Sequence, residues 1–167
     1  MTERPDFIAH YSVHQRPLND GGFADLGGLG SPLGRALGLT RIGIHYEIMP
    51  PGHRSSFPHA ESHEEEFVLV LRGRPDVWID GELFALEEGD AVGFPAGTGI
   101  AHAFLNNSSA DVTLLIVGEA NKAENRINYP LNPERMAQFA QDGRAWLDAP
   151  KRPLGAHDGV ARAGARV

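Results

Sequence analysis

The chain has 167 residues, a formal net charge of −7 and a pI near 5.5. This length fits one domain with short extensions, and the acidic balance argues against a nucleic-acid surface, which needs a basic patch. The sequence contains no Cys. Disulfides, thiolate nucleophiles and Cys-based zinc sites are therefore excluded.

No apolar run in the sequence is long enough to cross a membrane, and the first residues lack the apolar segment of a signal peptide. We therefore expect a cytoplasmic protein that binds neither membrane nor nucleic acid.

Residues 1–40 predict an N-terminal arm and a glycine-rich loop. The first twenty residues place His10 and His14 among polar residues and prolines, which is typical of a surface arm or an edge strand. Residues 21–40 are rich in glycine and indicate a flexible loop or a lid over a pocket. They lack the strand-then-helix context of a phosphate-binding loop.

Residues 41–120 predict short β-strands. From Arg41 to Met49 apolar and polar residues nearly alternate, which predicts a half-buried strand with Tyr46 on the same face as the isoleucines. We expect Tyr46 to point inward, where it is a candidate proton donor or substrate anchor. The uninterrupted apolar run Phe67 to Leu71 predicts a buried strand.

Further strands follow at short intervals. Two segments flank Asp80-Gly81, a strong signal for a two-residue hairpin turn. Seven or so short strands with hairpin spacing predict an all-β sandwich or barrel. The later strands are expected at Asp76 to Ile79, Glu82 to Leu86, Ala91 to Phe94, Ile100 to Leu105 and Val112 to Val117.

Residues 121–167 predict one helix and a tail. Asn132 is a good N-cap, Pro133 fits the first turn, and Gly143 can end a helix that begins at Pro133. Beyond Pro150 the chain is rich in Gly, Pro, Ala and Arg, so the tail is expected either to pack on the barrel or to be partly disordered.

Residues 59–66 combine metal-ligand residue types ahead of the apolar strand at 67–71. In an extended chain His59, Glu61 and His63 share one face. Glu66 would take the first inward position of the strand, where a carboxylate is costly unless it is paired or bound to a metal. The alternative is a solvated acidic loop ahead of a strand.

Two spacings in the chain resemble the two signature motifs of the cupin superfamily. The first runs through Gly52, His59, Glu61, Glu66 and Gly73, and the second through Gly89, Pro95, Gly97, His102 and Asn106. The chain departs from the family pattern at position 61, where a second His is usual, and has a longer gap between Gly97 and His102. The resemblance covers roughly residues 41–118.

The resemblance implies a double-stranded β-helix, or jelly-roll, barrel at 41–120, with the arm at 1–40 and the helix and tail at 121–167. It implies a homodimer and one divalent metal ion, of which zinc, iron, manganese and nickel suit the donors. His59, Glu66 and His102 match three of the usual ligands. Glu61, His63 or water would complete the site, although some cupins hold no metal.

Two functions of different classes follow from this resemblance. One is an enzyme that acts on a small oxygen-rich molecule, of isomerase, lyase or dioxygenase type, at the metal. The other is a non-catalytic cupin that binds or senses a small ligand. A transcription regulator is disfavoured, because the sequence shows one convincing helix and no helix-turn-helix pattern.

Overall fold

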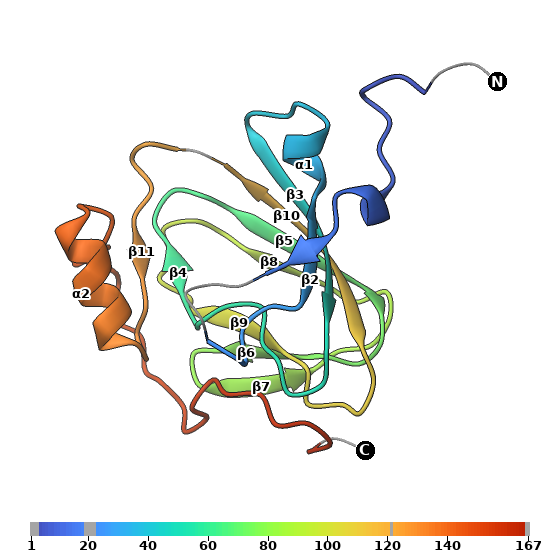
Figure 1. Cartoon of the computed structure of the whole chain (residues 1–167). Helices are drawn as coiled ribbons and strands as arrows, with labels where there is room; N and C mark the ends of the chain where they lie inside the picture. The colour runs from blue at the N-terminus through green and yellow to red at the C-terminus, as the bar shows by residue number, and fades with distance from the viewer. Residues whose placement is uncertain (1–3, 19–22, 121, 166–167) are drawn as a thin grey trace.

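The computed structural model describes residues 4–18, 23–120 and 122–165. Two antiparallel sheets face each other and close into a jelly-roll barrel, as predicted (Figure 1). The elements, in chain order, are η1 (Tyr11–Val13), β1 (Arg16–Pro17), β2 (Leu29–Pro32), α1 (Leu33–Ala36), β3 (Ile42–Met49), β4 (Ala60–Glu61), β5 (Glu66–Arg72), β6 (Asp76–Ile79), β7 (Glu82–Ala85), β8 (Ala91–Phe94), β9 (His102–Leu105), β10 (Val112–Glu119), β11 (Ile127–Asn128) and α2 (Pro133–Gln141).

The larger sheet has the order β1-β2-β3-β10-β5-β8, and the smaller sheet has the order β7-β6-β9. The hairpin between β6 and β7 turns at Asp80 and Gly81, whose φ angles of 48° and 92° are those of a two-residue turn that twists with its strands. A short pair, β11 with β4, lies at one side of the barrel.

The hydrophobic core lies between the two sheets. The larger sheet contributes inward side chains of β3, β5 and β10, and the smaller sheet contributes Val77 and Phe104. Phe57, Trp78, Phe94 and Phe104 are all buried. The main cluster consists of Met49, Val68, Val70, Val77, Phe94, Phe104, Val112 and Leu114.

The orientation of β3 corrects the expectation for Tyr46. Met49, Glu47 and His45 share the inner face of β3, because Glu47 is paired with the buried Leu114. Tyr46 therefore lies on the outer face of the sheet, where its ring stacks on Tyr11 of the arm at a centroid distance of 4.1 Å. Alternation defined two faces correctly, but the more apolar face is the outer one.

The glycine-rich segment is more ordered than the expected loop or lid. Within its described part, β2 pairs with β3 in the larger sheet, and α1 follows directly. In the arm, β1 pairs with β2 at the sheet edge, which agrees with the edge-strand alternative. Residues 19–22 and 1–3 of these two predictions lie outside the described residues.

The C-terminal region covers the outer face of the smaller sheet. The helix α2 begins after Asn132, whose side chain accepts a hydrogen bond from the Arg135 amide at 2.9 Å, so the predicted cap is confirmed. The tail then runs below β7 in Figure 1, and its His157 carbonyl accepts a hydrogen bond from the Trp78 indole at 2.8 Å. Among the described residues, no helix is long and apolar enough to span a membrane.

Candidate functional site

The polar site lies at one end of the barrel interior, where four neighbouring strands reach the same level. Strand pairing places Gly43 of β3, Gly118 of β10, Glu66 of β5 and Phe94 of β8 side by side, all on the inner face. Deeper in the barrel the same strands carry the aliphatic core. The site therefore lies on the same inward-facing strand surfaces as the hydrophobic core, at the end nearer to solvent.

His102 enters the site from the smaller sheet. It is 3% exposed, and its Nε2 lies 3.2 Å from Oε1 of Glu66. The Phe94 ring lies flat against the imidazole at a centroid distance of 3.5 Å and an interplanar angle of 4°. Phe94 thus fixes the plane of the ring and directs Nε2 at the carboxylate. The other ring nitrogen, Nδ1, is buried without a hydrogen-bond partner.

His59 lies next to His102, because the backbones of these two residues form an isolated antiparallel bridge. Their ring centroids are 4.9 Å apart. Nδ1 of His59 lies 2.9 Å from the Phe57 carbonyl, to which it donates, so Nε2 keeps its lone pair. Burial, followed by the charge of His102, lowers the pKa of His59 to about 4.

Glu66 connects these histidines with the inner face of the larger sheet. Burial alone would raise the pKa of its carboxyl group. The hydrogen bond from His102 and the charges of the histidines around it outweigh that effect, so the pKa is lowered. The Glu66 side chain therefore stays ionised at neutral pH.

Glu61 and His63, the two alternatives for a fourth ligand, lie in different places. Glu61 ends β4 and is half-buried; burial first, and then the charges of Glu64 and Glu66, raise its pKa to about 7. His63 is exposed, and its Nδ1 lies 2.7 Å from the Ser62 hydroxyl. The chain leaves the strand after position 61, so the extended register that would align both side chains ends there.

Two residues of the site had not been identified from the sequence. His45 and Glu47 point inward from β3, and the charge of Glu66 acts on both. Burial lowers the pKa of His45, and burial followed by the charge of Glu66 raises that of Glu47 to about 7. The signal was present in the sequence, because these are the polar positions of an alternating strand.

A cavity of about 310 Å³ opens beside Glu66 at this end of the barrel. That volume is at the small end of the range of ligand sites. Its described lining includes acidic side chains and one histidine but neither Lys nor Arg. The lining consists of Gly43, His45, Glu61, Glu64, Glu65, Glu66, Ile116, Gly118, Glu119 and Ala120.

The imidazole and carboxylate groups of the site are of the types that bind a divalent metal ion, but they are not arranged as a complete metal site. Among the described residues, no group of three or more His, Cys, Asp or Glu side chains is arranged to hold a metal ion. Two ligand atoms bound to one ion at about 2.1 Å each lie roughly 3 Å apart, close to the 3.2 Å between His102 Nε2 and Glu66 Oε1. The unpaired His102 Nδ1 shows that the ring has no other polar partner.

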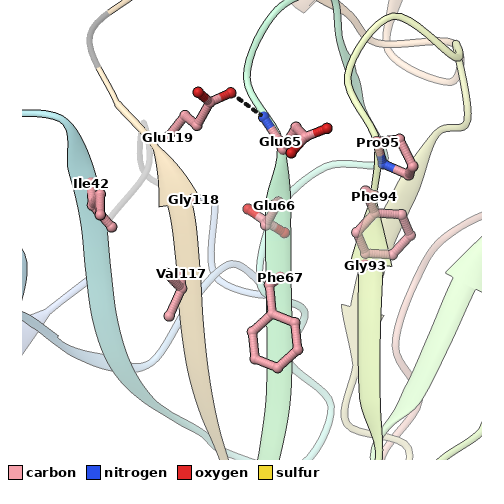
Figure 2. Close-up of a pocket in the computed structure, with 10 residues that line it drawn as sticks. All are labelled: Ile42, Glu65, Glu66, Phe67, Gly93, Phe94, Pro95, Val117, Gly118 and Glu119. Atoms are coloured by element: carbon pink, nitrogen blue, oxygen red, sulfur yellow. Dashed lines mark hydrogen bonds between the residues drawn. The ribbon is translucent and has the colours of Figure 1, made fainter.

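A second, larger hollow of about 430 Å³ lies on the outer face of the same sheet. Figure 2 shows Ile42, Val117 and Phe67 on neighbouring strands of that face, and the bond of 3.2 Å from the Glu65 amide to Glu119 at its edge. Ile42 and Phe67 are 48% and 43% exposed. Glu65, Glu66 and Glu119 reach this hollow, but the rest of its lining is mostly apolar and includes no histidine, so it is not the candidate site.

The fold and the enclosed polar cluster together define a jelly-roll barrel with a small, acidic cavity. A family model described as Cupin domain matches residues 45–118. Residues 45–118 therefore match a cupin domain, and the predicted resemblance to the cupin superfamily is confirmed. A comparison with curated proteins finds no match.

Three solved structures illustrate the likeness. A sugar phosphate isomerase of a cupin superfamily from Silicibacter pomeroyi is 32% identical over 60% of this chain and 64% of its own, with a TM-score of 0.58. A provisionally named sugar phosphate isomerase from Acidithiobacillus ferrooxidans is 31% identical over 61% of this chain and 64% of its own, also with a TM-score of 0.58.

The third structure is the polyketide cyclase RemF from Streptomyces resistomycificus, which is 18% identical over 84% of this chain and 97% of its own, with a TM-score of 0.60. At that identity the likeness shows the fold alone. The chain spans less than two thirds of the length of the two isomerase structures.

Proposed function

We propose that this protein is a metal-dependent cupin enzyme that acts on a small oxygen-rich molecule, most simply as an isomerase. The observations that support the proposal are the contact between His102 and Glu66, the neighbouring ring of His59, and the cavity of small-molecule size beside Glu66. The two isomerase structures support the reaction type.

His59, Glu66 and His102 would hold the ion, with Glu61 preferred to His63 as the fourth ligand. Glu61 lines the cavity together with Glu66, whereas His63 is exposed and bonded to Ser62. A bound divalent ion would polarise a substrate carbonyl and stabilise the negative charge that develops when a neighbouring C–H proton leaves. Zinc, iron, manganese and nickel all suit two imidazoles with carboxylates.

The side chains around the cavity would handle the protons. His45 lines it and is not among the proposed ligands, so its imidazole is the group that would take up and return a proton. The narrow, half-enclosed barrel mouth limits the access of water to a bound substrate. An isomerisation needs these functions and no external oxidant or reductant.

Metal analysis of protein purified without chelator, followed by turnover assays, tests the proposal. We expect about one equivalent of metal per chain and interconversion of an aldose and a ketose that stops when the metal is removed. Glu61→Ala should weaken metal binding more than His63→Ala does. Tight ligand binding without turnover at any metal would instead support the binding or sensing function. A protein that binds no metal would contradict the metal-dependent function.

We also propose that the functional unit is the barrel at 41–120, and that it forms a homodimer through the outer face of the larger sheet. Phe67, Ile42 and Leu71 leave exposed apolar area there. Light scattering coupled to size exclusion should give twice the chain mass, and Phe67→Asp should shift it to the monomer. A monomeric wild-type protein would exclude this assembly.

A further inference from the structure

Two glycines form part of the inner wall at the barrel mouth. Gly43 of β3 and Gly118 of β10 are directly paired, and Gly118 is paired in turn with Glu66 of β5. Neither glycine has the left-handed φ angle that would require glycine. Glycine in the interior of a strand weakens the strand, so its presence there calls for a steric reason.

The fold supplies that reason at Gly118 but not at Gly43. A Cβ atom at Gly118 would lie 3.2 Å from the Glu65 carbonyl oxygen, which is tight. A Cβ atom at Gly43 would meet the Gly118 oxygen and His45 Nε2 at 3.7 Å each, which is ordinary contact. An alanine at 43 would therefore fit this chain. The space left open at Gly43 is available to a molecule that approaches the backbone closely.

That space belongs to the 310 Å³ cavity and is flanked by hydrogen-bonding side chains. His45 is the next inward residue of β3, and Glu66 lies beyond Gly118 on β5. Glu61 and Glu64 extend the lining toward the rim. These groups accept hydrogen bonds at several points around a floor that carries no side chains.

The sign of the charge around the floor is uniform. Among the described residues that line the cavity, several are acidic and none is Lys or Arg. Lys122, two residues beyond the lining residue Ala120, donates to Glu119 at 2.6 Å and to the His63 carbonyl at 2.7 Å. Away from the proposed metal ion, a phosphate or carboxylate on the floor would meet carboxylates at short range in a partly desolvated cavity, where repulsion is strong.

We propose that Gly43 and Gly118 form the floor of the substrate seat, between His45 and Glu66, and that this seat takes a hydroxyl-rich molecule bearing no negative charge. The inference rests on the proposed function and narrows its substrate class. Carboxylates and a neutral imidazole accept hydrogen bonds from neighbouring hydroxyl groups. The substrate is therefore a free sugar, a polyol or an amino sugar, not a sugar phosphate.

Calorimetric titration of the manganese-loaded protein tests this inference with D-fructose, D-glucosamine and D-fructose 6-phosphate. We expect at least one of the two unphosphorylated sugars to bind about tenfold more tightly than the phosphate ester or better. The two unphosphorylated probes distinguish a neutral ligand from a cationic one. Tighter binding of the phosphate ester, or saturation by neither unphosphorylated sugar, would overturn the inference.

Gly43→Ala tests the floor itself. It should weaken binding of the preferred sugar about tenfold or more, while manganese affinity stays at the wild-type value and the unfolding temperature stays the same or rises. The matched control is Gly93→Ala in the same sheet, where a Cβ atom meets nothing within 4 Å and points to the outer face. Equal sugar affinity in Gly43→Ala and Gly93→Ala would overturn the inference.

A third variant addresses Arg16, a cation outside the described lining of the cavity. The charge of Arg16 acts on His45, so Arg16 is the residue best placed to attract a phosphate to this end of the barrel. Arg16→Gln should leave the affinity for the preferred sugar unchanged, and a loss of about tenfold would overturn the assignment of an uncharged ligand.

These experiments distinguish a failure of the sugar seat from a failure of the proposed metal-dependent function. A protein that binds manganese and prefers the phosphate ester would keep the metal-dependent function and lose the seat. A protein that binds sugar on the Gly43 floor but no metal would keep the seat and lose the metal-dependent function.

Discussion

The two ends of the barrel interior are built from the same strands but carry different types of residue. The closed end is the one filled by buried aliphatic side chains, and the open end is the one with the polar cluster. At the closed end the inward positions of β3, β5 and β10 hold Met49, Val70 and Leu114, all of which are buried. At the open end the same strands present Gly43, Glu66 and Gly118. The backbone ladder is continuous between the two ends, so the fold supplies a rigid frame and the residue types alone decide which end carries the polar groups.

The comparison indicates that, within one strand, the positions that stabilise the fold differ from the positions that form the candidate site. The closed end stabilises the fold by removing apolar surface from water. The open end has groups that would be costly to bury without partners. A substitution at one end should therefore leave the property supplied by the other end largely intact.

The largest expected effect is at the open end. His102→Ala removes the imidazole that contacts Glu66 and should lower metal affinity at least about a thousandfold, because loss of an outer-shell partner alone costs 10–100-fold. Metal titration measures it, with the exposed His10→Ala as the control. Full metal occupancy in His102→Ala would remove His102 from the ligand set.

The next effect is at the closed end. Leu114 is fully buried, so Leu114→Ala should lower the free energy of unfolding by about 2–5 kcal/mol while metal affinity changes less than about twofold. Urea denaturation measures the first quantity. The neighbouring Leu115→Ala, on the outer face, should cost less than half as much. A large loss of metal affinity in Leu114→Ala would show that the two ends are coupled.

Between the two ends, Glu47 should make stability depend on pH. Burial and then the charge of Glu66 raise its pKa from 4.5 to about 7, so the fold favours the protonated carboxyl group. The stability that depends on the protonated Glu47 carboxyl group is fully present below pH 4.5 and is lost as the pH rises to 7 and above. Glu47→Gln should therefore stabilise the metal-free protein by about 1–3 kcal/mol at pH 8 relative to wild type.

The measurement is denaturation of chelator-treated protein at pH 4 and pH 8. The advantage of Glu47→Gln should disappear at the lower pH, where the wild-type carboxyl group is protonated in both states. Glu87→Gln, at an exposed turn, should follow the wild-type profile. An equal effect of Glu47→Gln at both pH values would show that charge is not its cause.

The smallest effect is expected outside the barrel. Tyr46 stacks on Tyr11 on the outer face, so Tyr46→Phe should change the free energy of unfolding by less than about 0.5 kcal/mol and leave metal affinity and turnover unchanged. A drop in turnover of tenfold would place the hydroxyl in the reaction and contradict the outward position.

Much of the fold was predictable because local signals carried it. The Asp80-Gly81 turn, the apolar run at 67–71 and the capped helix at Pro133 each depend on neighbouring residues, and each is present. The strand β2 was not predicted, because a glycine-rich sequence has little strand propensity and Leu29–Pro32 becomes a strand by pairing with β3.

For the candidate site, the sequence by itself determined which residues are chemically able to act: motif spacing selected His59, Glu66 and His102 from eight histidines and many carboxylates. Only the tertiary structure decided which face of β3 is inside, and with it the inward position of His45 and the outward position of Tyr46. The reason is that an alternating strand specifies two faces with equal precision, while the choice between them depends on which face another sheet covers. Here β6 and β9 cover the face with Met49, so His45 on the same face lines the cavity.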